Sequence, residues 1–309
     1  MNNYILLLEY LINIILYSAI FTNKYKERKQ IHYELQKTKK YLKAYIQKDI
    51  INKPKYRTLD EKEKEVLVNI LLNLKKENKD LYEFFKKVLL YTNKANIRNL
   101  GNNIQTLKIY KENKNKLIMI LKDESTIGKY RPSENKIFLY DNKKTTINHE
   151  LLHVSSSNTD CDTVGFNKIY SENNDLKYSE IGRGLNEGYT ELLNNRISTE
   201  RSYSYILLNK IAFLIELLFE NKTDMKDHYF NSNVEGIIYE LSKYIEKEEI
   251  IELLIDIDEL YHTKSILMYY KIKKKLLKIA KENKTKEETK NFKKEYKQNH
   301  LVKIMRKSL

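Results

Sequence analysis

Glycine and proline are scarce in this chain, which has 7 glycines and 2 prolines among its 309 residues. Both residue types favour turns and interrupt helices, so their scarcity predicts long helices joined by few tight loops. The glycines are also unevenly placed, because most of them lie between residues 128 and 188. We therefore expect strands and turns in the middle of the chain and helices on both sides of it.

This pattern divides the chain into three regions. We expect a helical N-terminal region over residues 1–100, a core of mixed structure over 101–200, and a helical C-terminal region over 201–309 that completes the domain. Residues 205–220 are apolar almost all round, which predicts a deeply buried helix. The segment from residue 271 onward is amphipathic and rich in lysine, and we expect a tail that frays into solvent.

The middle region contains short segments with a strand-like composition. Residues 106–110 and 116–121 favour strands and are joined by a polar stretch, which predicts a hairpin. Residues 136–140 predict another short strand, and Thr145 or Thr146 can cap a helix that follows it. The expected fold class is therefore α+β and mostly α, with a small antiparallel sheet beside a central helix.

The net charge of the chain is +15, which suggests an acidic protein, nucleic acid or an anionic membrane surface as a partner. The charge is not evenly distributed: residues 101–200 contain 14 basic and 14 acidic side chains, so the flanking regions carry the whole excess. No sequence motif for nucleic-acid recognition accompanies the basic residues. Solvated helix faces explain most of this charge, and an acidic substrate remains an option.

The single cysteine, Cys161, excludes a disulfide within the chain. A lone cysteine cannot stabilise a secreted fold through a disulfide, so a reducing compartment, the cytoplasm, is the expected location. Cys161 could also act as a nucleophile or as a fourth metal ligand. It lies in a polar stretch without a ligand partner at zinc-binding spacing, which disfavours both roles.

The N-terminal segment, residues 4–21, is almost entirely apolar. No basic residue precedes it, so it is a poor match to a signal peptide. Glu9 and Asn13 share one stripe of a helix, which favours a buried helix with one wet edge over a membrane anchor. If the segment does anchor the chain, the basic cluster 24–29 predicts that the remainder stays in the cytoplasm.

The sequence HELLH at residues 149–153 carries the clearest chemical signal. On a helix, His149 and His153 are one turn apart on the same face, which suits two nitrogen ligands of one zinc ion. Glu150 lies beside the first histidine, where it can hold a zinc-bound water and accept its proton. The alternative is a core helix that happens to carry two histidines.

A catalytic zinc site needs a third protein ligand. The residues after the motif place Ser156 and Thr159 where metzincin peptidases have glycine and histidine, so that class is excluded. Residues 184–193 predict a second amphipathic helix with Glu187 and Glu191 on one face. One of these carboxylates can bind the metal while the other supports a histidine ligand; two solvent-facing acids are the alternative.

The HExxH motif, followed by the stretch from Asn186 to Glu191, resembles the gluzincin metallopeptidases, which have HExxH and then a downstream helix of the type NExxxD. Glu191 occupies the place where that family more often has aspartate. The resemblance implies a zincin-like core with these roles: zinc ligands His149, His153 and Glu187, general base Glu150, and supporting residues Asn186 and Glu191 behind the ligands.

The resemblance also implies residues that contact the substrate. Ile137 and Leu139 would belong to an edge strand that pairs with an extended peptide. His228 lies roughly where the family places a group that stabilises the oxyanion of the transition state. Further candidates for that role are Tyr170, Arg183, Tyr189, Tyr203 and Tyr205.

The sequence therefore predicts a cytoplasmic, zinc-dependent metallopeptidase that hydrolyses a peptide or protein substrate, with Glu150 as the general base. The alternative is a regulatory or binding module with a structural zinc that binds an acidic protein or nucleic acid. A further alternative is a peptidase that is anchored in a membrane through residues 4–21, with the catalytic core in the cytoplasm.

Overall fold

The computed structural model describes residues 25–33, 35–36, 39, 54, 56, 59–91, 98–121, 127–141, 143–158, 163–171 and 178–299. The apolar segment 4–21 and Cys161 lie outside these residues, so the predictions made for them stay untested. Among the described residues, no helix combines the length and the apolar character needed to cross a bilayer.

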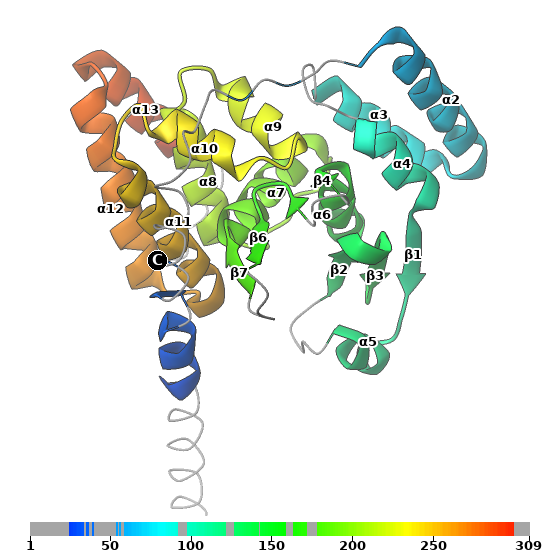
Figure 1. The fold of residues 1–309 in the computed structure, drawn as a ribbon, viewed down its shortest axis with the longest axis horizontal. Helices are drawn as coiled ribbons and strands as arrows, with labels where there is room; N and C mark the ends of the chain where they lie inside the picture. The colour runs from blue at the N-terminus through cyan, green and yellow to red at the C-terminus, as the bar shows by residue number, and fades with distance from the viewer. Residues whose placement is uncertain are drawn as a thin grey trace, which may run out of the picture.

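The described chain is mostly helical, with small sheets, as the sequence predicts (Figure 1). Its helices are α2 Glu61–Glu77, α3 Lys79–Tyr91, α4 Arg98–Thr106, α5 Lys114–Leu121, α6 Lys144–Ser155, α7 Arg183–Ile197, α8 Ile206–Leu218, α9 Lys222–Phe230, α10 Val234–Leu241, α11 Lys247–Thr263, α12 Ile266–Asn283 and α13 Lys286–Gln298. Its strands are β1 Lys108–Lys111, β2 Gly128–Arg131, β3 Lys136–Leu139, β4 Ser157–Asn158, β5 Thr163–Val164, β6 Lys168–Ser171 and β7 Tyr178–Ile181.

The largest sheet has the strand order β1-β3-β2, in which β1 is parallel to β3 and β2 is antiparallel to it. The sheet is therefore mixed rather than purely antiparallel. The predicted hairpin is wrong, because residues 116–121 belong to helix α5 and β1 pairs with β3 instead. Asn113 starts that helix by accepting a hydrogen bond from the backbone N–H of Lys116 (2.9 Å), and Leu117 packs against Phe138 of the sheet.

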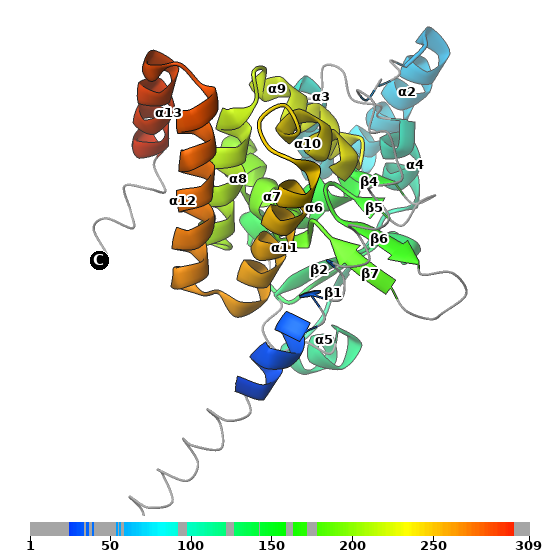
Figure 2. The same ribbon diagram turned by 60° about the vertical axis from the view of Figure 1, so that its left-hand side comes forward.

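Helix α6 begins at Lys144, with Lys143 as its N-cap residue. The prediction that Thr145 or Thr146 caps this helix is wrong, because both residues lie inside its first turn. Thr146 is buried against the sheet, where its methyl group lies close to Gly128. The helix still follows β3 directly, so that the HELLH motif sits on a regular helix beside the sheet (Figure 2).

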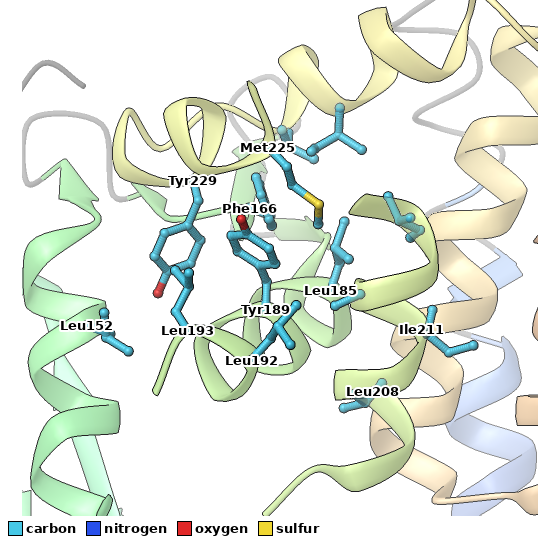
Figure 3. Close-up of a cluster of buried hydrophobic side chains, with 14 of the residues drawn as sticks. Leu152, Phe166, Leu185, Tyr189, Leu192, Leu193, Leu208, Ile211, Met225 and Tyr229 are labelled. Carbon is cyan, nitrogen blue, oxygen red and sulfur yellow. The ribbon is translucent and has the colours of Figure 1, made fainter. Parts of the chain in front are cut away.

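One hydrophobic cluster joins residues from Leu35 to Tyr296. Its centre lies between α7, α8 and α9, where Tyr189, Phe166 and Tyr229 pack together with the leucines of α7 (Figure 3). Helix α8 is buried over most of its length, which confirms the prediction for residues 205–220. The three-region division of the chain stays a prediction, but one continuous core joins side chains from all three regions.

The lysine-rich C-terminal segment does not fray over its described part, so that prediction is wrong. Helices α12 and α13 bury Ile272, Leu276, Phe292 and Tyr296. Thr285 and Glu288 form a capping box that starts α13. The lysines occupy the solvent face, while the apolar stripe packs on α8 and α11.

Candidate metal centre

Two neighbouring helices supply the residues of the site. Helix α6 carries His149, Glu150 and His153, and helix α7 carries Glu187 and Glu191. The two helices pack against each other near the centre of the molecule (Figure 1). Because the helical repeat places residues four apart on one face, each helix presents its pair of side chains to the other.

Three of these side chains converge on one point. Nε2 of His149 lies 3.2 Å from Nε2 of His153 and 3.1 Å from Oε2 of Glu187. Nε2 of His153 is 3.6 Å from the same carboxylate oxygen. A tetrahedral zinc with ligands at about 2.0–2.1 Å holds neighbouring ligand atoms about 3.3 Å apart. The spacing of the three atoms therefore fits a zinc ion.

The second ring nitrogen of each histidine, Nδ1, also has a polar neighbour. Oε2 of Glu191 lies 3.1 Å from Nδ1 of His149, an arrangement that leaves Nε2 of His149 directed at the point of convergence. The side-chain amide of Asn186 lies 3.4 Å from Nδ1 of His153, and its oxygen accepts a hydrogen bond from the backbone N–H of Phe166 (3.2 Å). Both supporting residues predicted from the sequence thus contact a histidine of the group.

Charge explains why this buried group favours a cation. Burial on its own lowers the pKa of His149, but hydrogen bonds to Glu187 and Glu191 outweigh it and raise that pKa. Burial raises the pKa of Glu187, and the two histidines lower it by more, to well below the usual range. Acidic side chains therefore stabilise positive charge at the point of convergence, which a divalent metal would supply.

Glu150 is buried and accepts a hydrogen bond from the backbone N–H of Tyr130 in β2 (2.7 Å). Burial raises the pKa of Glu150, and the neighbouring His149 and His153 partly oppose this effect. The carboxylate is thus fixed beside the metal-binding atoms by a backbone group rather than by a flexible side chain. A carboxylate held in this way suits the role of a general base near neutral pH.

The start of α7 is anchored from a distant part of the chain. Asp258 in α11 accepts hydrogen bonds from the backbone N–H groups of Gly182 (2.9 Å) and Gly184 (2.7 Å). A side chain at Gly184 would collide with the backbone of Ile257, so the two helices approach closely there. Asp258 therefore positions the helix that carries Glu187. Sequence reasoning missed this residue, because nothing local links residue 258 to the site.

Gly165 packs against the supporting amide. It has a φ of +55°, and a Cβ atom there would lie 2.1 Å from Oδ1 of Asn186 and 2.6 Å from the ring of Tyr229. We expect Gly165→Ala to lower the free energy of unfolding by about 2–4 kcal/mol, through backbone strain and overpacking. Urea unfolding checks this value. The matched control is Gly101→Ala in α4, where the nearest atom is the flexible end of Ile70, at 3.2 Å.

Gly101→Ala should change the free energy of unfolding by no more than about 1 kcal/mol, since alanine favours a helix. Equal effects of the two substitutions would contradict a special role for Gly165.

The predicted substrate strand needs correction. β3 is the central strand of its sheet, and the side chains of Ile137 and Leu139 are fully buried, so neither can pair with a peptide. The strand beside Glu150 is β2, whose one neighbouring strand among the described residues is β3. Because the N–H of Tyr130 points to Glu150, the backbone groups of Gly128 and Tyr130 face the outer edge.

The structure does not bring His228 together with the other predicted site residues. Its imidazole receives a hydrogen bond from the hydroxyl of Tyr56 and lies against Phe219 and Gly236. Burial lowers its pKa to about 4. No contact between His228 and the metal-binding group is found within the described part of the chain, so its proposed role in stabilising the oxyanion is unsupported.

Tyr205 lies next to the site instead. Its ring centre is 5.7 Å from that of His149, and its backbone has the left-handed conformation (φ 51°), which is uncommon for a residue other than glycine. The charge of Glu187, followed by burial, raises the pKa of Tyr205, so its hydroxyl stays protonated. Behind it, Tyr261 packs on Tyr205 and on the guanidinium of Arg183 (4.9 Å to the ring centre).

Among the described residues, neither Tyr189 nor Tyr203 is found in contact with His149, His153 or Glu187. Tyr189 is buried in the core and donates a hydrogen bond to Glu216 (3.1 Å). Tyr203 is 52% exposed. The side chain of Tyr170 lies outside the described part of the structure. A tyrosine-rich sequence gave no signal that singled out Tyr205 from these others.

Comparison of the chain with protein-family models, with curated proteins and with solved structures found no match in any of the three. The functional interpretation therefore depends on the geometry of the group formed by His149, His153 and Glu187, and on the residues around it.

Proposed function

We propose that the chain is a zinc-dependent metallopeptidase of the gluzincin type. The observation that carries this proposal is the convergence of His149, His153 and Glu187, whose potential ligand atoms all lie within 4.8 Å of one another. Among the described residues this group has no fourth histidine, cysteine or carboxylate ligand. Structural zinc sites are usually closed by four protein ligands, so three ligands favour a catalytic site with an open position.

Each residue around the metal then has a distinct task. Zinc at this site would lower the pKa of a bound water to about 7 and polarise a peptide carbonyl. Glu150 accepts the proton of the water and delivers it to the leaving amine. Glu191 and Asn186 hold the two imidazole rings in position. Burial excludes bulk water from the general base and so strengthens these interactions.

The outer edge of β2 is the proposed binding surface for the substrate backbone. The backbone groups of Gly128 and the carbonyl group of Tyr130 face that edge, while the N–H of Tyr130 is bonded to Glu150. A peptide that pairs there as an added strand would place one of its carbonyl groups near the general base. Lys129 lies on the same strand, which agrees with an acidic substrate, whereas Arg131 pairs with Glu134 (3.0 Å).

Tyr205 is the proposed donor to the developing oxyanion. We expect Tyr205→Phe to lower kcat by about 10²–10³-fold, because one preorganised donor contributes about that much, while zinc content stays unchanged. Tyr203→Phe is the matched control, since that ring is 52% exposed and two residues away. Steady-state kinetics on a cleaved peptide check this prediction. A Tyr205→Phe enzyme with the kcat of the wild type would contradict it.

Digestion of a peptide library, followed by mass spectrometry, tests the proposed activity. We expect internal cleavage of a subset of peptides, loss of cleavage with a zinc chelator, and recovery after zinc is added back. If the zinc-loaded protein cleaves none of the peptides, and binds an acidic protein or nucleic acid instead, the alternative of a structural zinc module replaces the proposal. The lone cysteine agrees with a cytoplasmic location, which is part of the same proposal.

A further inference from the structure

Exposed apolar side chains gather where α11 turns into α12. Ile266 is 54% exposed, Leu267 is 82% exposed and Tyr270 is 46% exposed, although all three belong to the first turns of an otherwise amphipathic helix. Tyr25, at the start of the described helical segment 25–33, is 63% exposed. We refer to Tyr25, Ile266, Leu267 and Tyr270 as the tip surface.

Two ion pairs show how the N-terminal segment reaches this turn. His32 lies 3.5 Å from Glu259, and Lys39 lies 2.8 Å from Glu252. From the first pair to the second, the residue number rises in the N-terminal segment and falls in α11. The two segments therefore run antiparallel. Helix α11 ends at Thr263 and α12 starts at Ile266, so the start of the N-terminal segment points toward the turn between these two helices. Figures 1 and 2 agree, since the blue helical segment lies beneath the turn between α11 and α12.

The segment is fixed in this position by packing as well as by charge. Leu35 is part of the main core, and Ile31 packs against it. Residues 25–30, at the start of the segment, are exposed. The tip surface is therefore a stable part of the fold and is formed by residues from both ends of the sequence.

Basic residues surround the apolar side chains. Residues 25–30 and 262–271 together contain a single acidic side chain, Glu27. The same stretches contain the basic residues Lys26, Arg28, Lys29, Lys264 and Lys271. All five basic side chains are exposed, and Lys271 also pairs with Asp256 (3.0 Å). The combination of exposed apolar side chains with a positive rim suits an anionic lipid surface.

The position of the apolar stretch 4–21 is compatible with the same partner. It ends a few residues before Tyr25, and a membrane anchor is the alternative to a buried helix for this stretch. We propose that the tip surface rests on an anionic lipid bilayer, with its apolar side chains among the headgroups and its basic residues near lipid phosphates. This inference is independent of the proposed peptidase activity.

A fluorescent probe at the tip tests the proposal in the full chain. Cys161→Ser removes the native thiol, and Leu267→Cys then carries an environment-sensitive dye. With phosphatidylcholine vesicles that contain phosphatidylserine, we expect a several-fold increase and a blue shift of the emission. The matched control is Met119→Cys, which is 78% exposed. It belongs to α5, a helix that stands apart from the turn between α11 and α12 in Figure 1, and its emission should not change.

Charge reversal distinguishes binding through the basic residues from nonspecific adsorption. Lys26→Glu combined with Lys264→Glu should reduce the response at residue 267 by at least about tenfold at low vesicle concentration, because basic residues near an anionic surface each contribute to binding. The dye reports the local environment of residue 267, and only a response that falls on charge reversal supports binding through the basic residues of the tip surface.

Three outcomes would overturn the proposal. The first is no change at residue 267 with anionic vesicles. The second is an equal change at residues 119 and 267, which would indicate adsorption without a defined surface. The third is an emission already blue-shifted without vesicles, which would show that another protein segment or a second copy of the chain covers the tip surface.

Discussion

Replacing Glu150 by glutamine is expected to lower kcat for peptide hydrolysis by about 10²–10⁴-fold, the usual contribution of a general base. The amide keeps the shape of the side chain and cannot accept the proton of the attacking water. Because Glu150 is not one of the three converging ligands, zinc content and thermal stability should stay close to those of the wild type. Stopped-flow or steady-state kinetics on a cleaved peptide measure this change in kcat.

Glu200→Gln is the matched control for this change, since it makes the same chemical substitution at an exposed position near the end of α7. It should leave kcat unchanged. A Glu150→Gln protein that hydrolyses peptides at the wild-type rate would contradict the assigned role. A variant that loses zinc as well as activity would instead make Glu150 part of the metal site.

Removing the metal should lower the thermal stability of the protein markedly. A ligand that binds only the folded state stabilises it by about 4 kcal/mol when its free concentration is about 1,000 times Kd. For a chain of this size, with an unfolding entropy of about 2.1 cal/mol/K per residue, that corresponds to a Tm difference of about 6 °C. The physical reason is local: a divalent cation would interact favourably with the partly buried Glu187 and the buried Glu191, and without it only the imidazoles balance these carboxylates.

Differential scanning calorimetry with and without a chelator measures this difference. His153→Ala serves as the control, since a variant that cannot hold zinc should have the same Tm in both conditions. An unchanged Tm of the wild type after complete removal of metal would contradict a role of the metal in stability.

The part of the site that follows helical periodicity could be predicted from the sequence. A spacing of four residues places His149 beside His153, and Glu187 beside Glu191, whatever the rest of the fold does. The structure then brings the two pairs together on α6 and α7. The prediction of a mostly helical fold with a small sheet is confirmed for the same reason, because the scarcity of glycine and proline is a property of the whole chain.

Features that depend on tertiary packing could not be predicted in this way. Residues 116–121 are a short run of apolar residues with no clear period, so helix and strand were not distinguishable there. Their burial against Phe138 as part of α5 decides between the two. Similarly, no local pattern shows that β3 is a central strand, since its neighbours β1 and β2 are defined only once the sheet forms.

Long-range contacts explain the remaining differences. Asp258 holds the start of α7 from a position 74 residues after Gly184 in the sequence. Tyr205 reaches His149 because of its left-handed backbone at the start of α8, a conformation that side-chain identity alone does not predict. The prediction that His228 stabilises the oxyanion depended on its position in the sequence relative to the family pattern. In the structure, His228 packs with Tyr56 and Phe219 instead.

The central claim is that His149, His153 and Glu187 form a three-ligand zinc site, and metal content tests it most directly. Elemental analysis would be performed on the wild type and on Glu187→Ala, both purified without added metal. The account predicts about one zinc per chain in the wild type and its near-complete loss in the variant. A wild type that contains no zinc, and takes up none when zinc is supplied, would contradict it.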